Sequence, residues 1–196
     1  MRRKGESVPR MTGANANSEM RATIAETLVT MVRERSYSSI SVRELSSRAH
    51  VSKSSFYRCF DSKDDALLHY GRVLYACDFE SDLRRGVAKP SREETSHFLR
   101  KRFDFVRRHA SYFRVLESNG LLDRMFASLD ADLADLLSGG TASVSPYTRA
   151  LFVGSSASII KCWIQRDFRE DEDELVELFS RVAELTWPWA PCWTTG

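Results

Sequence analysis

Apolar residues recur in this sequence with the spacing of an α-helix, and this periodicity constrains the fold more than any other feature. Glycine and proline, 9 and 5 of the 196 residues, fall mostly at the edges of the apolar patterns. No run of alternating apolar and polar residues bounded by turn residues indicates a β-strand. The pattern predicts an all-α protein of about nine helices, without a repeat of solenoid length.

Composition narrows the class of protein. With 42% hydrophobic and 29% charged residues, the chain has material for a core and for a solvated surface. The longest apolar stretch, 150–163, is diluted by serines and carries Lys161, and the N-terminus lacks an apolar signal region. The four cysteines lie far apart, without the spacing of a metal or redox site. We therefore expect a cytoplasmic protein without a membrane span, metal or cofactor.

Charge is distributed unevenly along the chain. Residues 1–63 hold 12 Lys and Arg against 6 Asp and Glu, whereas residues 64–196 hold 17 against 21. The net charge of the whole chain is only +2. Charge that is concentrated in one segment tells more about a binding partner than this total does. The basic first third predicts an anionic partner such as nucleic acid.

Start and stop signals divide the chain into four segments. Residues 1–17 have no apolar periodicity and are expected to form a flexible basic arm. Residues 18–66 predict a small three-helix unit, and residues 67–186 predict a larger helical domain. Residues 187–196 form a tail rich in tryptophan and proline.

The small unit carries two clear helix starts. Ser41 and Glu44 form a capping box at the start of a short second helix, and Ser52 caps a third helix from Lys53 to Phe60. Phe56 and Phe60 share one face of that third helix, while the opposite face is polar and basic. A helix of this kind suits the major groove of DNA. From spacing alone, a solvated face of a small helical bundle remains an alternative.

The sequence resembles the DNA-binding domain of the TetR family of transcriptional regulators. The resemblance runs continuously over about residues 18–70 and is strongest in V-S-K-S-S-F-Y-R-C-F at 51–60 and D-S-K-D-D at 61–65. It implies that Lys53, Ser54 and Arg58 face bases or nearby phosphates and that Tyr57 and Lys63 hold the DNA backbone. Including neighbouring donors and small residues, we expect DNA contacts from Arg43, Ser52, Lys53, Ser54, Ser55, Tyr57, Arg58 and Lys63.

Two positions depart from the pattern of the family. His50 stands in the turn where the family often has glycine, and histidine is among the side chains that tolerate positive φ. Cys59 stands where histidine is frequent. Neither departure is expected to break the fold, but Cys59 changes the end of the third helix.

The resemblance also implies a dimer. In the family the last two long helices, here 146–167 and 172–186, pair with those of a second subunit, and two recognition helices then lie about 34 Å apart on a palindromic operator. The run of small residues from Gly154 to Ser158 supports a close approach of helices, although packing within one subunit is the alternative. Candidate interface residues are Gly154, Ser155, Ala157, Ser158, Leu178 and Val182.

A small-molecule effector is a further implication of the resemblance. The family binds such ligands within the helices that follow the DNA-binding domain. Candidate lining residues form an aromatic wall around one cation, which suits an apolar or aromatic ligand with an acidic group. They are Phe98, Arg102, Phe105, Tyr112, Phe126 and Trp163, and the alternative is that these aromatic residues are core.

These observations favour a ligand-responsive repressor. A helical protein that binds another protein, and an all-α enzyme with a site in the larger domain, are the alternatives. The sequence has no G-x-S-x-G elbow, no glycine-rich phosphate loop and no H-E-x-x-H pair, so we do not expect an enzyme.

Overall fold

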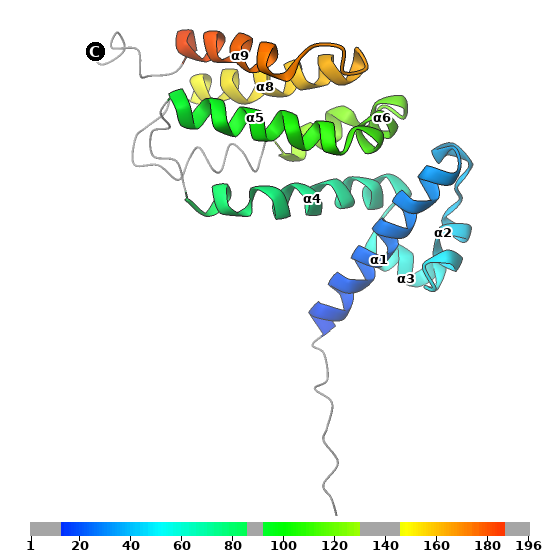
Figure 1. The fold of residues 1–196 in the computed structure, drawn as a ribbon. Coiled ribbons are helices and arrows are strands. Elements are labelled where there is room, and N and C mark those ends of the chain that lie inside the picture. The colour runs from blue at the N-terminus through cyan, green and yellow to red at the C-terminus, as the bar shows by residue number, and fades with distance from the viewer. Residues whose placement is uncertain (1–12, 86–91, 130–145, 187–196) are drawn as a thin grey trace, which may run out of the picture. The chain divides into compact units, whose positions relative to one another are not determined.

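The computed structural model describes residues 13–85, 92–129 and 146–186, and all regular structure in these ranges is helical (Figure 1). This confirms the all-α prediction. A short 3-10 turn, η1, spans Tyr37–Ser39, and residues 122–129 are also helical. The labelled helices are α1 (Gly13–Glu34), α2 (Val42–Arg48), α3 (Lys53–Cys59), α4 (Lys63–Arg85), α5 (Arg92–Arg108), α6 (Ala110–Ser118), α8 (Pro146–Gln165) and α9 (Glu172–Thr186).

The chain divides into two compact units, Met1–Tyr70 and Gly71–Gly196. The first unit contains α1, η1, α2, α3 and the start of α4, and the rest of α4 belongs to the second unit. Our domain boundary, between residues 66 and 67, falls in the same helix and stays a prediction. Helix α1 begins at Gly13, five residues before the start that we predicted at Ser18.

The core of the first unit is built from the apolar stripe of α1 and the inner faces of α2 and α3. Ile24 and Leu28 of α1, Leu45 of α2 and Phe56 of α3 are completely buried. Each such side chain contributes roughly 1.5–3 kcal/mol through removal of its surface from water. Burial of Phe56 therefore fixes which face of α3 points outward.

Aromatic rings fill much of the core of the second unit. Tyr75 and Phe79 of α4 stack with ring centroids 4.3 Å apart, and Phe79 meets Phe105 of α5 edge to face at 5.8 Å. Phe105 in turn lies 5.9 Å from Phe113 of α6. Helix α9 packs against both α5 and α8. The aromatic contacts join three successive helices, and the packing of α9 on α5 joins helices that are distant in the sequence.

The helix starts follow the predicted capping residues where the structure describes them. Ser41 and Glu44 form the capping box of α2, and the Ser52 hydroxyl accepts a hydrogen bond from the backbone of Ser55 at the start of α3. The Asp65 backbone donates to the Ser62 hydroxyl at 3.2 Å. The tail 187–196 lies outside the described residues.

A strained turn joins α8 to α9. Asp167 and Phe168 adopt φ of +57° and +60°, which costs about 1–2 kcal/mol for each residue that is not glycine. Helix α8 therefore ends at Gln165, earlier than the predicted end at Asp167. Arg107 Nη1 donates to the Phe168 carbonyl at 3.3 Å, and Arg114 Nε donates to the Asp167 carboxylate at 2.8 Å. Arginines of α5 and α6 thus hold the turn in place.

Candidate nucleic-acid interface

A tight turn connects α2 to α3. The Val51 backbone donates to the Ser46 carbonyl at 2.9 Å, and the His50 backbone donates to the Ser47 carbonyl at 3.2 Å. His50 adopts φ of +55°, so the histidine takes the left-handed conformation that we expected it to tolerate. The turn leads directly to Ser52, the residue that caps α3.

Helix α3 has one buried and one exposed face, as predicted. Phe56 and Cys59 are buried, whereas Lys53, Ser54 and Arg58 are exposed. Tyr57 is 50% exposed even though its ring meets Phe56 edge to face, with centroids 5.3 Å apart. The outward face therefore offers cationic, hydroxyl and phenol groups on a helix only two turns long.

Three serines at the start of α3 hydrogen-bond to one another. The Ser52 hydroxyl lies 2.9 Å from that of Ser55 and 3.0 Å from that of Ser54. Ser52 and Ser54 are exposed and Ser55 is half-buried. The small side chains leave the N-terminal end of α3 open to a close approach.

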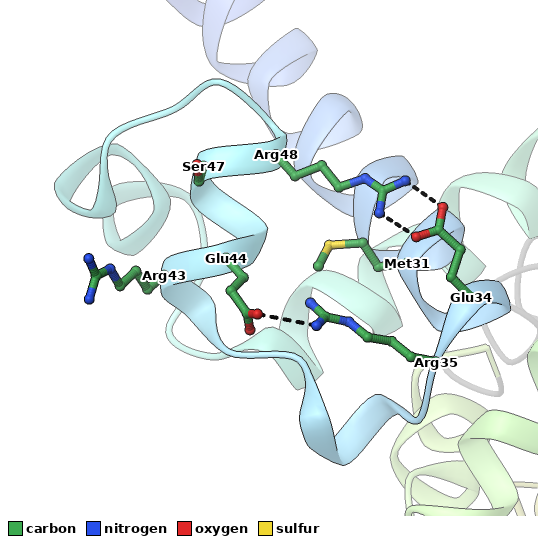
Figure 2. Close-up of a pocket in the computed structure, with 7 residues that line it drawn as sticks. All are labelled: Met31, Glu34, Arg35, Arg43, Glu44, Ser47 and Arg48. Carbon is green, nitrogen blue, oxygen red and sulfur yellow. Dashed lines mark hydrogen bonds and ion pairs between the residues drawn. The ribbon is translucent and has the colours of Figure 1, made fainter.

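Arg43 of α2 is one of the residues that line a surface cleft of about 490 Å³ between α1 and α2, and its guanidinium points away from the other side chains drawn (Figure 2). Arg48 forms a bidentate ion pair with Glu34, and Arg35 Nη1 lies 3.2 Å from Glu44 Oε1. The acidic groups of the cleft are thus already paired with arginines. Arg43 points outward from this arrangement and is exposed.

The Glu44 carboxylate is held in its charged form by the start of α2. It accepts hydrogen bonds from the Ser41 backbone at 3.1 Å and from the Ser41 hydroxyl at 2.8 Å. The pKa of Glu44 is lowered from 4.5 to about 2. The backbone hydrogen bond from Ser41 contributes most to this shift, followed by the Ser41 hydroxyl and the pairing with Arg35. The cap of α2 is therefore fully formed at neutral pH.

Lys63 lies at the first position of α4 and is half-buried. Its ammonium group donates to the carbonyls of Tyr37 at 2.8 Å and Ile40 at 3.0 Å. Of the residues predicted to contact DNA, Lys63 is therefore placed differently from the exposed side chains of α3, because its charge is directed to the protein backbone.

Sequence reasoning missed a contact at the end of α3. Arg21 of α1 donates to the Cys59 carbonyl and lies over the ring of Phe60, 4.4 Å from its centroid. A cation at the C-terminal end of a helix satisfies a free carbonyl and complements the helix dipole. The partners are 38 residues apart in the sequence, so no local pattern identifies the contact.

Four of the predicted effector residues belong to one network of aromatic contacts in the second unit. Phe98 and Phe105 both meet Phe79, and Phe105, Tyr112 and Phe126 all lie beside Phe113. The Tyr112 hydroxyl contacts Met125 Sδ at 3.8 Å.

Arg102 and Trp163 lie elsewhere in the second unit. Arg102 is 2% exposed, and its Nη1 donates to the Ser156 hydroxyl at 2.9 Å. Trp163 packs against Phe103 and Phe168, below the Arg107 guanidinium. The role of all six residues in ligand binding stays a prediction.

The predicted dimer residues lie on different sides of α8 and α9. Gly154 and Ser158 are exposed, Ser155 is half-buried and Ala157 is buried. Leu178 of α9 is 50% exposed, and the side chain of Val182 lies outside the described part of the structure.

Sequence reasoning missed two large residues on the exposed side of α8. Tyr147 is 80% exposed and Leu151 is 57% exposed. Their spacing to Gly154 and Ser158 places all four on one stripe of the helix.

The described residues include neither a candidate membrane span nor a metal-binding cluster. None of the helices there is both long enough and apolar enough to cross a bilayer. No group of three or more His, Cys, Asp or Glu residues in the described part of the chain is arranged to hold a metal ion.

Comparison with known proteins gives a family match to the segment that contains α2 and α3. Residues 24–70 match the family described as bacterial regulatory proteins, tetR family. The uncharacterized HTH-type transcriptional regulator YxbF of Bacillus subtilis (strain 168) is 25% identical over 163 residues, which cover 74% of this chain. The chain spans 40% of the length of that relative.

Solved structures share the fold. FadR of Thermus thermophilus, a TetR family repressor in complex with lauroyl-CoA, aligns with a TM-score of 0.58 and 19% identity, covering 83% of this chain and 92% of that one. FadR of Bacillus subtilis in complex with stearoyl-CoA aligns with a TM-score of 0.53 and 15% identity, covering 83% and 96%. Residues 24–70 therefore match the family of bacterial regulatory proteins described as tetR family, and the chain shares its fold with the two FadR structures.

Proposed function

We propose that this protein is a transcriptional repressor that binds a palindromic DNA operator as a dimer and is released by a small apolar or aromatic effector. The single observation that carries the proposal is the two-faced helix α3. Its buried Phe56 fixes the helix in the unit, and its outward face is polar and basic. The major groove of B-DNA, about 12 Å wide, admits a helix presented in this way.

The exposed groups of α3 differ in reach and suit different parts of the duplex. Lys53 and Arg58 are long enough for guanine edges or phosphates, whereas Ser54 and Ser55 permit close contact. The Tyr57 hydroxyl and the Arg43 guanidinium are suited to phosphates. Backbone N–H groups at the start of the helix, beside Ser52, are oriented as donors for a phosphate oxygen.

A DNA-binding test uses the region upstream of the gene that encodes the protein. Gel-shift affinity is expected to fall about a thousandfold between 50 and 200 mM salt if about six phosphates are contacted. Replacing Lys53 and Tyr57 with alanine is expected to weaken binding strongly. Arg181→Ala, an exposed cation on α9, serves as the matched control and is expected to leave affinity unchanged. Binding that is indifferent to the first two replacements would refute the proposed interface.

The exposed side of α8 supports the dimer. Tyr147 and Leu151 place large apolar surface in solvent, which is typical of interaction sites when such residues are contiguous. A Cβ at Gly154 would meet no atom within 4 Å, so a second helix has room to approach. A two-fold dimer then presents two copies of α3 to successive major grooves, about 34 Å apart.

Leu151→Asp tests the dimer directly. A carboxylate at the centre of an apolar interface is expected to give monomers in analytical ultracentrifugation, and operator affinity falls with it. Lys53→Ala is the control, because it weakens DNA binding without touching α8 and keeps the dimer. A wild-type protein that sediments as a monomer at micromolar concentration contradicts this part of the proposal.

The effector proposal rests on the aromatic core and on one buried cation. Arg102 of α5 lies beside Ser156 of α8, in the unit that holds the aromatic clusters. The two FadR structures above are complexes with lauroyl-CoA and stearoyl-CoA, which combine an apolar chain with anionic phosphates. Long-chain acyl-CoA is therefore the first ligand class to test.

Titration of lauroyl-CoA into the protein–DNA complex distinguishes this ligand class from others. Release of DNA at micromolar ligand, with free CoA and laurate as controls, supports an acyl-CoA effector. Retention of the DNA complex at saturating acyl-CoA excludes this class and leaves the DNA-binding proposal untouched.

A further inference from the structure

The ammonium group of Lys63 is occupied by the backbone that leads into α2. It donates to the carbonyl of Tyr37 at 2.8 Å and to that of Ile40 at 3.0 Å, and it lies 4.2 Å from the centroid of the Tyr37 ring. These carbonyls belong to the turn η1 and to the residue that ends it. The Tyr37 carbonyl also accepts a hydrogen bond from the Ile40 backbone at 3.1 Å, so the Lys63 ammonium adds a second donor at the end of the turn. A cation at this end of a helical turn is favourable.

Tyr37 is held from a second side by the residue that follows Lys63. Its hydroxyl donates to the Asp64 carboxylate, and the tyrosine is only 6% exposed. Two consecutive residues in the first turn of α4 therefore hold one buried tyrosine. We call Tyr37, Lys63 and Asp64 the α4 anchor.

The α4 anchor acts at the start of the helix-turn-helix. Ile40, whose carbonyl accepts from Lys63, directly precedes Ser41, the N-cap of α2. Helix α2 is further tied to α1 by the Arg48 and Glu34 ion pair (Figure 2). Helix α3 follows α2 through the tight turn at His50. The α4 anchor therefore ties the first turn of α4 to the segment that leads into α2 and α3.

We propose that Lys63 is a positioning residue for DNA binding, which with Tyr37 and Asp64 fastens the start of α4 to the segment that enters α2 and so holds α2 and α3 in place. This inference rests on the proposed function and assigns Lys63 a role other than a phosphate clamp. Two of the three protons of its ammonium are directed to backbone carbonyls, and a phosphate contact would compete with them.

Salt dependence separates a positioning role from a phosphate contact. Each lysine that neutralises a phosphate contributes about 0.9 to the slope of log affinity against log salt concentration. Lys63→Met keeps most of the apolar stem but removes the charge, and is expected to weaken operator binding about tenfold with the slope unchanged. Lys53→Met on the exposed face of α3 is the matched control, and its slope is expected to fall by about 0.9. A comparable fall in the slope of Lys63→Met would overturn the proposal.

Hydrogen exchange tests the anchor without DNA. In Lys63→Met, amide exchange over residues 37–45 is expected to rise about tenfold, while Lys53→Met leaves that segment unchanged. If Lys63→Met loses helical content by circular dichroism, Tyr37→Phe replaces it in this experiment, because it removes only the hydroxyl contact with Asp64. Amide exchange over residues 37–45 is expected to rise in Tyr37→Phe as well.

Unchanged exchange over residues 37–45 in a folded Lys63→Met protein would overturn the anchor. Because this readout uses no DNA, failure of the anchor is distinguishable from failure of the proposed function. If the wild-type protein binds no DNA while Lys63→Met still raises exchange over residues 37–45, the proposed repressor function is refuted. The contact of α4 with the segment before α2 is then still supported.

Discussion

Replacement of Gly71 by alanine probes the closest helix contact in the second unit. Gly71 is a buried residue of α4, and a Cβ there would overlap Tyr112 Oη and lie 2.7 Å from Met125 Cε. Ordinary contacts between heavy atoms begin near 3.5 Å, so the tyrosine hydroxyl must move by about 1 Å. Tyr112 and Met125 are themselves buried, which limits the room for that movement.

The magnitude follows from two opposing effects. Overpacking of a buried contact costs about 1–3 kcal/mol, and the two short distances favour the upper part of that range. Alanine gains about 1 kcal/mol over glycine in a helix. We therefore expect Gly71→Ala to lower the free energy of unfolding by about 1–2 kcal/mol, measured by urea unfolding followed by circular dichroism.

A double-mutant cycle makes the prediction specific. Tyr112→Phe removes the oxygen atom that the new methyl group meets first, so the cost of Gly71→Ala is expected to fall by about 1 kcal/mol in that background. The cycle cancels the other effects of losing the hydroxyl. An alanine variant that is more stable than the wild type, with no coupling to position 112, would show that α4 does not pack as closely as described.

Three further perturbations test the first unit. His50→Gly is expected to raise the free energy of unfolding by up to about 1 kcal/mol, and His50→Val to lower it, because φ of +55° suits glycine and strains a β-branched side chain; thermal unfolding of both variants checks this. Ser52→Ala is expected to cost about 1 kcal/mol through loss of the α3 cap, measured by urea unfolding, and a change below a few tenths would contradict the capping role. The lowered pKa of Glu44 contributes stability that is complete above about pH 4.5 and is lost as the pH falls toward about 2; Glu44→Gln is expected to weaken this acid dependence in thermal unfolding, and an identical pH profile would contradict it.

Local features of the first unit could be predicted from the sequence. The capping residues Ser41 and Ser52 were identified from their spacing to the following residues, and Phe56 was placed on the buried face of α3. The left-handed turn at His50 was expected from its place in the pattern. Each of these features depends on residues within about one helical turn of one another, which is the range that periodicity and capping rules describe.

Contacts between distant segments could not be predicted in this way. The bonds from Lys63 reach back 26 and 23 residues, and Arg21 meets the end of α3 across 38 residues. The glycine at position 71 carries no local sign that Tyr112 will occupy the space beside it. Such partners are selected by the packing of helices in three dimensions, so only the structure identifies them.

The residues that are tolerated in the turn between α8 and α9 depend on residues of two other helices. Its left-handed residues, Asp167 and Phe168, are held by Arg107 of α5 and Arg114 of α6. Loss of either arginine during divergence leaves the strain without compensation, whereas glycine at 167 removes much of it. Among descendants of this chain, replacement of an arginine and acquisition of glycine should therefore arise as correlated changes.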